Sequence, residues 1–506
     1  MTTIVKSLPN EILEFVFIFA HPEVDVFHDE YFGGSSTWTL SHVSRRWRSV
    51  VLGSKLLWSR LLLQGRPYHT LQAVSLISRL CLAVARSAPI PFSVRVTDLE
   101  ESDSDDVVPD PDPSLTHRNV WERGVMFGPI FANAYRLETF LEEDSFIDSA
   151  YRTLSLFPMP FPALRVLQLN GEAISGGIGE DIHIPRIAPV LRKLHLTRFK
   201  LDEEYQAMVF SNLNLPWGQI THLTADCCNF EEAETGEKQL LHIQMFLNNF
   251  PNLQILTWLF DEDKEEEEDW DVGDVELDGK ELKTLNIRGM NSVTVPLLGR
   301  TRAPNLQKLQ LDLLDGPYAQ DWQSEDSEYT TSEASQRSWS PHIWEPGFLK
   351  TISNFIDRLH DKGSMTSLVL HGFYDLPVLD WIQQLPNLQV LSVHLMNRAL
   401  VKYLTWSESY RTLPFLELLT WSFDSVATKV EDQRIVKMVK SRTNPTPSSV
   451  TAPQTRLIRI RLLHEPQDAE IIKKSFLVKY LEAVTLISLE IVDLEDIEWH
   501  PLRLYT

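Results

Sequence analysis

The stretch "LPNLQVLSV" at residues 385–393 contains the pattern that decides the fold, an apolar residue at the first, fourth and sixth positions of "LQVLSV". Apolar and polar residues that alternate over so short a run are typical of a β-strand with one face buried. Pro386 disfavours helical geometry for the residue before it, so a preceding helix is expected to end there. The stretch therefore predicts a corner at which a helix gives way to a buried strand.

The same pattern recurs eleven times between residue 164 and the C-terminus, several times after a proline. Its fourth position is occupied by Leu167, Leu194, Leu223, Leu256, Leu285, Leu309, Leu368, Leu391, Leu419, Ile460 and Leu489. Seven of the ten intervals between these residues are 23 to 29 residues long, the period of a leucine-rich repeat. Stretches with helical periodicity, such as 238–250 and 348–363, lie between them. The sequence predicts an α/β fold, an irregular leucine-rich-repeat solenoid with a curved parallel sheet and outer helices.

The overall charge limits the classes of partner. The 506 residues include 47 Lys and Arg against 70 Asp and Glu, which gives a net charge of −23. Binding to nucleic acid needs clustered positive charge, so no nucleic-acid partner is expected. The N-terminus lacks the layout of a signal peptide, and no uncharged apolar window is long enough for a membrane span. The sequence therefore predicts an intracellular protein, in the cytoplasm or nucleus, without a membrane partner.

The first 63 residues predict a small helical unit. Pro9 suits the start of a helix, and the apolar residues after it follow helical spacing up to Ala20. Residues 21–37 predict a loop, and residues 40–50 a second helix with Leu40, Val43, Trp47 and Val50 on one stripe. Residues 54–63 form a short third element, so that the unit has three helices. So few residues bury little surface alone, and such a unit is expected to need a partner.

The rest of the chain divides by composition. Residues 64–97 predict a linking helix (70–88) and strand (89–96) that cap the solenoid, and residues 98–117 an acidic linker. The repeats occupy residues 118–506, with insertions at about 261–276, 321–346 and 426–455.

Residues that carry chemistry are few and scattered. The glycine-containing "GGIGED" (176–181) has acidic residues where a phosphate-binding loop needs lysine. His21, Asp25, His28 and Asp29 match no zinc spacing, and the three cysteines form no C-x-x-C pair. No Ser/His/Asp arrangement can be defended from spacing. We therefore expect no catalytic residue, no metal and no cofactor.

The strand pattern also predicts a substrate face. Because side chains alternate along a strand, the residue between the last two apolar positions is expected on the concave side of the sheet. The residues expected to form this face are Gln168, His195, Thr224, Thr257, Asn286, Gln310, Ser392, Thr420 and Arg461, while Val369 and Glu490 hold the same position in the other two repeats. Uncharged polar side chains favour a surface that binds a protein through hydrogen bonds. The alternative is an ordinary hydrated sheet face that binds nothing.

The N-terminal unit resembles an F-box. The residues that carry the resemblance are Leu8, Pro9, Glu11, Ile12 and Leu13, the run Val43-Ser44-Arg45-Arg46-Trp47, with serine where cysteine is common, and Leu57–Trp58. The whole chain is similar to the F-box proteins of mushroom-forming fungi (basidiomycetes), which follow the box with a helix, a strand and degenerate leucine-rich repeats.

This resemblance implies a non-catalytic substrate-recognition adaptor of an SCF-type cullin–RING ubiquitin ligase. The box would dock on the Skp-type adaptor, and through it on the cullin and RING subunits, while the repeats would bind an unknown protein substrate. It implies adaptor contacts by Leu8, Pro9, Ile12 and Leu13, and an F-box core of Val43, Trp47, Leu57 and Trp58. The alternatives are a scaffold that delivers no ubiquitin, and a hydrolase or transferase whose pocket is hidden in the repeats.

Overall fold

The structure is a computed structural model of the whole chain, in which two compact units divide at Glu232 and Ala233. Both units are α/β, and each contains an open parallel sheet. None of the boundaries predicted from composition coincides with this division. The described residues are 8–20, 24–25, 37–64, 70–97, 134–140, 161–170, 188–197, 217–226, 247–260, 277–289, 291–313, 346–371, 378–393, 396, 398–406, 412–422, 429–443, 457–464, 471–472, 475–483 and 487–493.

The first unit begins with helices α2 (Asn10–Ala20), α3 (Thr37–Val43) and α4 (Arg45–Gly53) and a 3-10 turn, η2 (Leu56–Trp58). The carbonyl oxygen of Pro9 accepts the first helical hydrogen bond of α2, from the Leu13 amide at 3.1 Å. The single helix predicted over 40–50 is wrong, because Ser44 divides it. Ser44 is extended (φ −157°), and its Oγ accepts a 3.1 Å bond from the Trp47 amide, which caps α4.

The third helix predicted over 54–63 is also wrong. After η2 the chain forms strand β2 (Arg60–Gln64), which pairs in parallel with β1 (Val24–Asp25) and β3 (Phe92–Thr97). Strand β1 lies in the stretch predicted as a loop. The run "RLLLQ" is too short for a helix and is long enough for a buried strand. The sheet therefore starts inside the segment that was expected to be purely helical.

Helix α5 (Thr70–Ser87) connects β2 to β3, which confirms the helix and the strand predicted over 70–96. The sheet of this unit continues through β4 (Ala134–Phe140), β5 (Val166–Asn170), β6 (Lys193–Thr197) and β7 (His222–Asp226), the last preceded by a 3-10 turn, η4 (Trp217–Gln219). Leu167, Leu194 and Leu223 are aligned in register and are almost completely buried. Strand β4 was not predicted, because Ala134 and Thr139 stand where the pattern has leucines.

The sheet of the second unit contains β8 (Ile255–Leu259), β10 (Thr284–Gly289), β12 (Lys308–Leu313), β13 (Ser367–His371), β14 (Val390–Val393), β15 (Leu418–Ser422), β16 (Arg459–His464) and β17 (Ser488–Asp493). Two further strands, β9 (Leu277–Asp278) and β11 (Thr301–Arg302), pair with each other. The predicted fourth-position residues from Leu256 to Leu489 lie opposite one another in every adjacent pair. The strands predicted from the repeated pattern are therefore confirmed.

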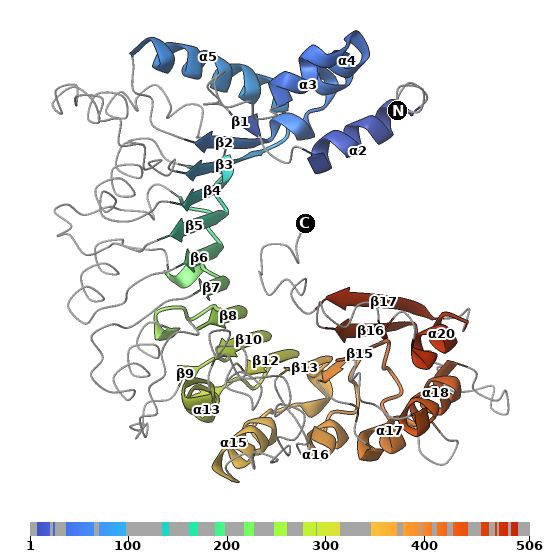
Figure 1. Ribbon diagram of the computed structural model, residues 1–506. Helices are drawn as coiled ribbons and strands as arrows, with labels where there is room; N and C mark the ends of the chain where they lie inside the picture. The colour runs from blue at the N-terminus through green and yellow to red at the C-terminus, as the bar shows by residue number, and fades with distance from the viewer. Residues whose placement is uncertain are drawn as a thin grey trace, which may run out of the picture. The chain divides into compact units, whose positions relative to one another are not determined.

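Helices α13 (Asn291–Arg300), α15 (Pro346–Asp357), α16 (Val378–Gln383), α17 (Arg398–Leu404), α18 (Lys429–Thr443) and α20 (Phe476–Glu482) lie outside the strands of the second unit (Figure 1). The helix predicted over 348–363 ends at Asp357, and a 3-10 turn, η6 (Lys362–Ser364), follows it. Part of the predicted insertion at 426–455 is helix α18. The insertion at 261–276, nearly all of 321–346 and the acidic linker lie outside the described residues, as does most of the helix predicted over 238–250.

Arginines join successive helices of this unit. Arg358, just after α15, donates to the carbonyl oxygens of Leu298 and Gly299 at the C-terminus of α13, at 2.9 and 2.8 Å. Arg442 of α18 donates to the carbonyl oxygen of Leu404, the last residue of α17, at 2.6 Å. A cation at a helix C-terminus satisfies carbonyls that have no partner within the helix and interacts favourably with its dipole. Each of these arginines therefore fixes a helix to the one before it.

Candidate protein-binding site

Helix α2 exposes a continuous apolar stripe. Ile12, Phe15, Val16 and Phe19 are 45, 60, 48 and 83% exposed, and their spacing of i, i+3, i+4 and i+7 places them on one face of the helix. On the opposite face lie Leu13 and Phe17, which are one turn apart and are each 1% exposed. The helix is apolar on both sides, so that burying one face leaves another in water.

The rest of the N-terminal segment adds to this apolar surface. Ten large apolar residues are exposed in the described part of the chain, and eight of them lie between residues 12 and 82. Besides the α2 stripe these are Val43, Leu52, Leu56 and Leu82, from α3, α4, η2 and α5. Exposed apolar side chains concentrated in one segment mark a protein-interaction site more often than single ones do. The first unit therefore carries the strongest candidate for a protein-binding surface.

Polar contacts hold α2 against α4. The Arg46 side chain donates to Asn10 Oδ1 at 3.1 Å and to the carbonyl oxygen of Leu8. Ser54 Oγ donates to Glu14 Oε1. The rings of Phe17 and Trp47 lie 4.7 Å apart at an angle of 56°. These contacts occupy the inner face of α2 and its N-terminus, and they fix the orientation in which the outer stripe is presented.

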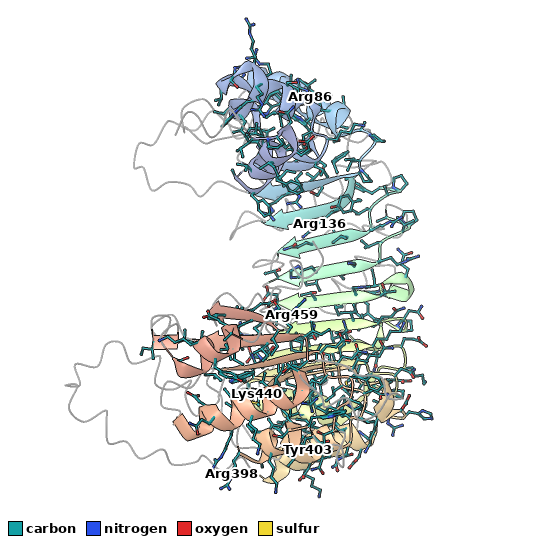
Figure 2. All side chains as sticks on the ribbon, turned by 90° about the vertical axis from the view of Figure 1, so that its right-hand side faces the viewer. Arg86, Arg136, Arg398, Tyr403, Lys440 and Arg459 are labelled. Atoms are coloured by element: carbon teal, nitrogen blue, oxygen red, sulfur yellow. The ribbon has the colours of Figure 1, made fainter. Side chains whose placement is uncertain are left out.

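An aromatic cluster joins α5 to this segment. The Trp38 and Trp58 rings meet edge to face at 4.9 Å, and Trp58 Nε1 donates to the carbonyl oxygen of Val51 at 2.7 Å. The guanidinium of Arg86, on α5, lies 4.4 Å from the Trp58 ring centre and 5.4 Å from that of Trp38 (Figure 2). Burial lowers the pKa of Arg86. The cation–π contacts offset part of this cost and attach α5 to α3 and η2.

The four residues expected to contact the adaptor differ from one another in exposure. Pro9 and Ile12 are exposed, and Leu8 is half-buried, so these three are accessible at the surface. Leu13 is buried, and its expected role as a surface contact is wrong. Leu13 is one turn before Phe17 and shares its inward direction. Phe15 and Phe19 were missed, although the run "ILEFVFIFA" is apolar around the whole helix, a signal that such residues cannot all be buried by one neighbour.

The four residues expected in the core of the N-terminal unit differ in burial. Leu57 and Trp58 are buried, and Trp47 is half-buried against Phe17. Val43 is 57% exposed, so its assignment to the core is wrong. Val43 is the last residue of α3, and the break at Ser44 turns it away from the stripe that one continuous helix would have formed.

The predicted substrate face is less open than expected. Gln168, His195, Thr257, Ser392 and Thr420 are buried, which corrects the prediction that they are accessible on the concave side. The other four, Thr224, Asn286, Gln310 and Arg461, are partly exposed.

Hydrogen bonds between neighbouring strands account for part of the limited exposure of this face. Asn286 Nδ2 donates to Thr257 Oγ1 at 3.1 Å, and Arg461 donates to Glu490 Oε2 at 2.8 and 3.0 Å. Polar side chains in adjacent strands thus bind one another, and only part of the face remains accessible.

One serine and one histidine meet on this sheet. His371 Nε2 and Ser392 Oγ lie 2.8 Å apart, and both residues are less than 8% exposed. A nucleophile also needs access for substrate and donors for the developing oxyanion. Buried between neighbouring strands, the pair stabilises the sheet rather than forming an accessible active site.

A row of basic side chains crosses the sheet of the first unit. Arg136, Lys193 and His222 occupy equivalent positions of β4, β6 and β7. Burial, and then the charge of Lys193, lower the pKa of His222 to about 4. Burial and the charge of Arg136 lower the pKa of Lys193. His222 is therefore neutral at physiological pH.

Within the described ranges no group of three or more His, Cys, Asp and Glu side chains is placed to hold a metal ion. His21, His28 and Asp29, considered from the sequence, lie outside those ranges, as does "GGIGED". No helix in the described part of the chain has the length and apolarity needed to cross a bilayer. Neither protein-family models nor curated proteins give a match to the sequence.

Proposed function

We propose that this protein is a substrate-recognition adaptor of an SCF-type cullin–RING ubiquitin ligase. The exposed stripe of Ile12, Phe15, Val16 and Phe19 on α2 carries the proposal, because it lies in the segment that resembles an F-box. The box would dock on a Skp-type adaptor, which links it to the cullin and RING subunits. The protein itself would be non-catalytic, and its location intracellular.

The energetics of the stripe support a binding role. Burying a phenylalanine side chain stabilises a complex by about 1.5–3 kcal/mol, and aromatic residues dominate the energy of many interfaces. Leaving Phe15 and Phe19 in water has no structural benefit for the helix, since Leu13 and Phe17 already fix it to α4. A partner that covers the outer face of α2 explains both phenylalanines.

The repeats would hold the protein substrate. We propose that Thr224, Asn286, Gln310 and Arg461 contribute, because these positions of the predicted face are partly exposed. The buried polar residues between them would set the shape and spacing of the strands rather than contact the substrate.

Affinity purification of the tagged protein from its own cells tests the proposal. Wild type should recover the Skp-type adaptor and the cullin, and a Phe15→Glu/Phe19→Glu variant should not. An Ile458→Glu/Ile471→Glu variant is the matched control, because these two apolar residues are also exposed but lie in the second unit. Equal recovery by all three proteins would contradict the proposal.

The same purification separates the proposal from a scaffold. A scaffold that delivers no ubiquitin would retain its partners in all three samples and would recover no ligase subunits. Recovery of the adaptor without the cullin would also favour a role outside ubiquitin transfer.

A further inference from the structure

Positive charge is concentrated in one part of this acidic chain. Residues 398–483 contain 14 lysines and arginines against 9 aspartates and glutamates, a net charge of +5. The remaining residues contain 33 against 61, a net charge of −28. The described part of residues 398–483 includes three helices, α17, α18 and α20.

The outward stripes of these helices are basic. Arg398 and Lys402 are exposed one turn apart on α17, and Lys437 and Lys440 one turn apart on α18. Lys479 is exposed on α20, where Glu482 is the exposed acid of the same stripe. We call the five cations Arg398, Lys402, Lys437, Lys440 and Lys479 the basic helical face.

The three helices form one continuous layer. Lys440 Nζ lies 4.8 Å from the ring centre of Tyr480, which joins α18 to α20. Arg442 joins α18 to α17 through the carbonyl oxygen of Leu404. Figure 2 labels Arg398 and Lys440 on this layer. The cations of neighbouring helices therefore belong to one surface.

Most of the positive charges on this face have no acidic partner among the described residues. Arg398, Lys402, Lys437 and Lys479 form no ion pair or hydrogen bond in the described part of the chain. The preceding helices differ, since the exposed charges on α15 and α16 include Lys350 but also Asp357 and Asp380. On this face five cations stand against one exposed carboxylate, Glu482, so like charges repel one another, and an anionic partner would relieve that repulsion.

We propose that the basic helical face binds an acidic, carboxylate-rich segment of a protein. A nucleic acid is disfavoured because the chain as a whole is strongly acidic, with a net charge of −23. A short acidic segment matches the charge of the face. The basic helical face shares no residue with the α2 stripe or with the sheet face, so this inference does not depend on the proposed ligase function.

A binding titration with full-length protein tests this. The probe is a dye-labelled peptide of residues 261–274, which contains ten carboxylates and one lysine, and the fluorescence anisotropy of the dye reports binding. The face variant is Lys402→Glu/Lys437→Glu/Lys440→Glu. The control variant is Lys55→Glu/Lys283→Glu/Lys350→Glu, which reverses three other exposed lysines and gives the same net charge. Circular dichroism establishes that all are folded.

Wild type and the control variant should bind the peptide equally, and more weakly as salt rises. The face variant should bind at least about ten-fold more weakly, since several ion pairs change sign together. A further variant changes Glu265–Glu268 to Gln in the protein and leaves the peptide unchanged. If the peptide binds this variant but not wild type, the chain's own acidic segment occupies the face, which supports the proposal.

Three results would overturn the proposal. These are the absence of peptide binding in all the proteins, the Glu265–Glu268 variant included, equal weakening in both lysine variants, and, in a parallel titration with vesicles of anionic lipid, binding to the vesicles alone.

Discussion

The guanidinium of Arg86 lies 4.4 Å from the centre of the Trp58 ring, and this contact joins helix α5, which connects β2 to β3, to the 3-10 turn η2. Trp58 also donates a hydrogen bond to Val51 and meets Trp38 edge to face. Helices α3, α4 and α5 and the turn η2 therefore share one set of contacts. The N-terminal helices are thereby attached to the helix that leads to β3.

Replacing Arg86 with alanine should loosen this junction. The loss of two cation–π contacts in a partly desolvated site should lower the free energy of unfolding by about 1–2 kcal/mol. Arg86→Lys should recover part of the loss, since it keeps the charge but not the planar stacking. Urea unfolding followed by tryptophan fluorescence measures both. Equal stability of wild type and Arg86→Ala would contradict a structural role for the contact.

Leu13 and Ile12, which are adjacent in sequence, should behave oppositely. Leu13→Ala removes a buried side chain and should destabilise the protein by about 2–4 kcal/mol. Ile12→Ala changes an exposed side chain and should alter stability by less than about 0.5 kcal/mol while weakening adaptor binding. Thermal unfolding and adaptor binding, measured on both variants, separate the two roles. A large loss of stability in Ile12→Ala would show that the outer face of α2 is covered within the protein itself.

Arg442 should contribute strongly to the stability of the second unit. Its guanidinium donates to the carbonyl oxygens of Leu404, Thr412 and Leu413, and burial lowers its pKa to about 10, so it remains charged at neutral pH. Arg442→Met leaves these carbonyls without their donor and should cost about 2–4 kcal/mol of unfolding free energy.

Gln433→Met, on the exposed side of the same helix, is the control and should change stability by less than about 0.5 kcal/mol. Denaturant unfolding of both variants measures the two changes in unfolding free energy. Similar midpoints for the two would mean that water replaces the guanidinium at little cost.

His222 should make stability depend on pH. Its pKa is lowered from 6.5 to about 4, so between these values the unfolded chain binds a proton that the folded chain does not. Stability should therefore decrease as pH falls from about 6.5 to about 4, and the contribution of this group should be about 1–2 kcal/mol after solvent screening.

His222→Gln removes this titration but not the others. Urea unfolding at pH 4, 5, 6 and 7 should show that wild type loses more stability on acidification than the variant does. Parallel pH profiles for the two proteins would contradict the lowered pKa.

The sequence predicted the strands of the repeats well because each strand buries its own leucines. Leu256, Leu285 and Leu309 are aligned and buried, so the local pattern and the tertiary structure agree. Strand β4 escaped prediction because Ala134 and Thr139 stand at positions where the other strands have larger apolar residues.

The candidate site was harder to predict. Side-chain spacing places Leu13 and Ile12 on a helix but does not state which face a neighbour covers. The break at Ser44 depends on one capping hydrogen bond, and it changed the position of Val43. Burial of Gln168 and Thr420 depends on packing around the strands, which alternation alone does not reveal.

The most direct test of the proposed function is a calorimetric titration of the purified full-length protein with a purified Skp-type adaptor. Wild type and Ile458→Glu/Ile471→Glu should bind with equal affinity, and Phe15→Glu/Phe19→Glu should lose at least about 100-fold, because two buried aromatic contacts are worth about 3 kcal/mol or more. Equal binding by all three proteins, or no binding by folded wild type, would contradict the proposal that the α2 stripe docks on the adaptor.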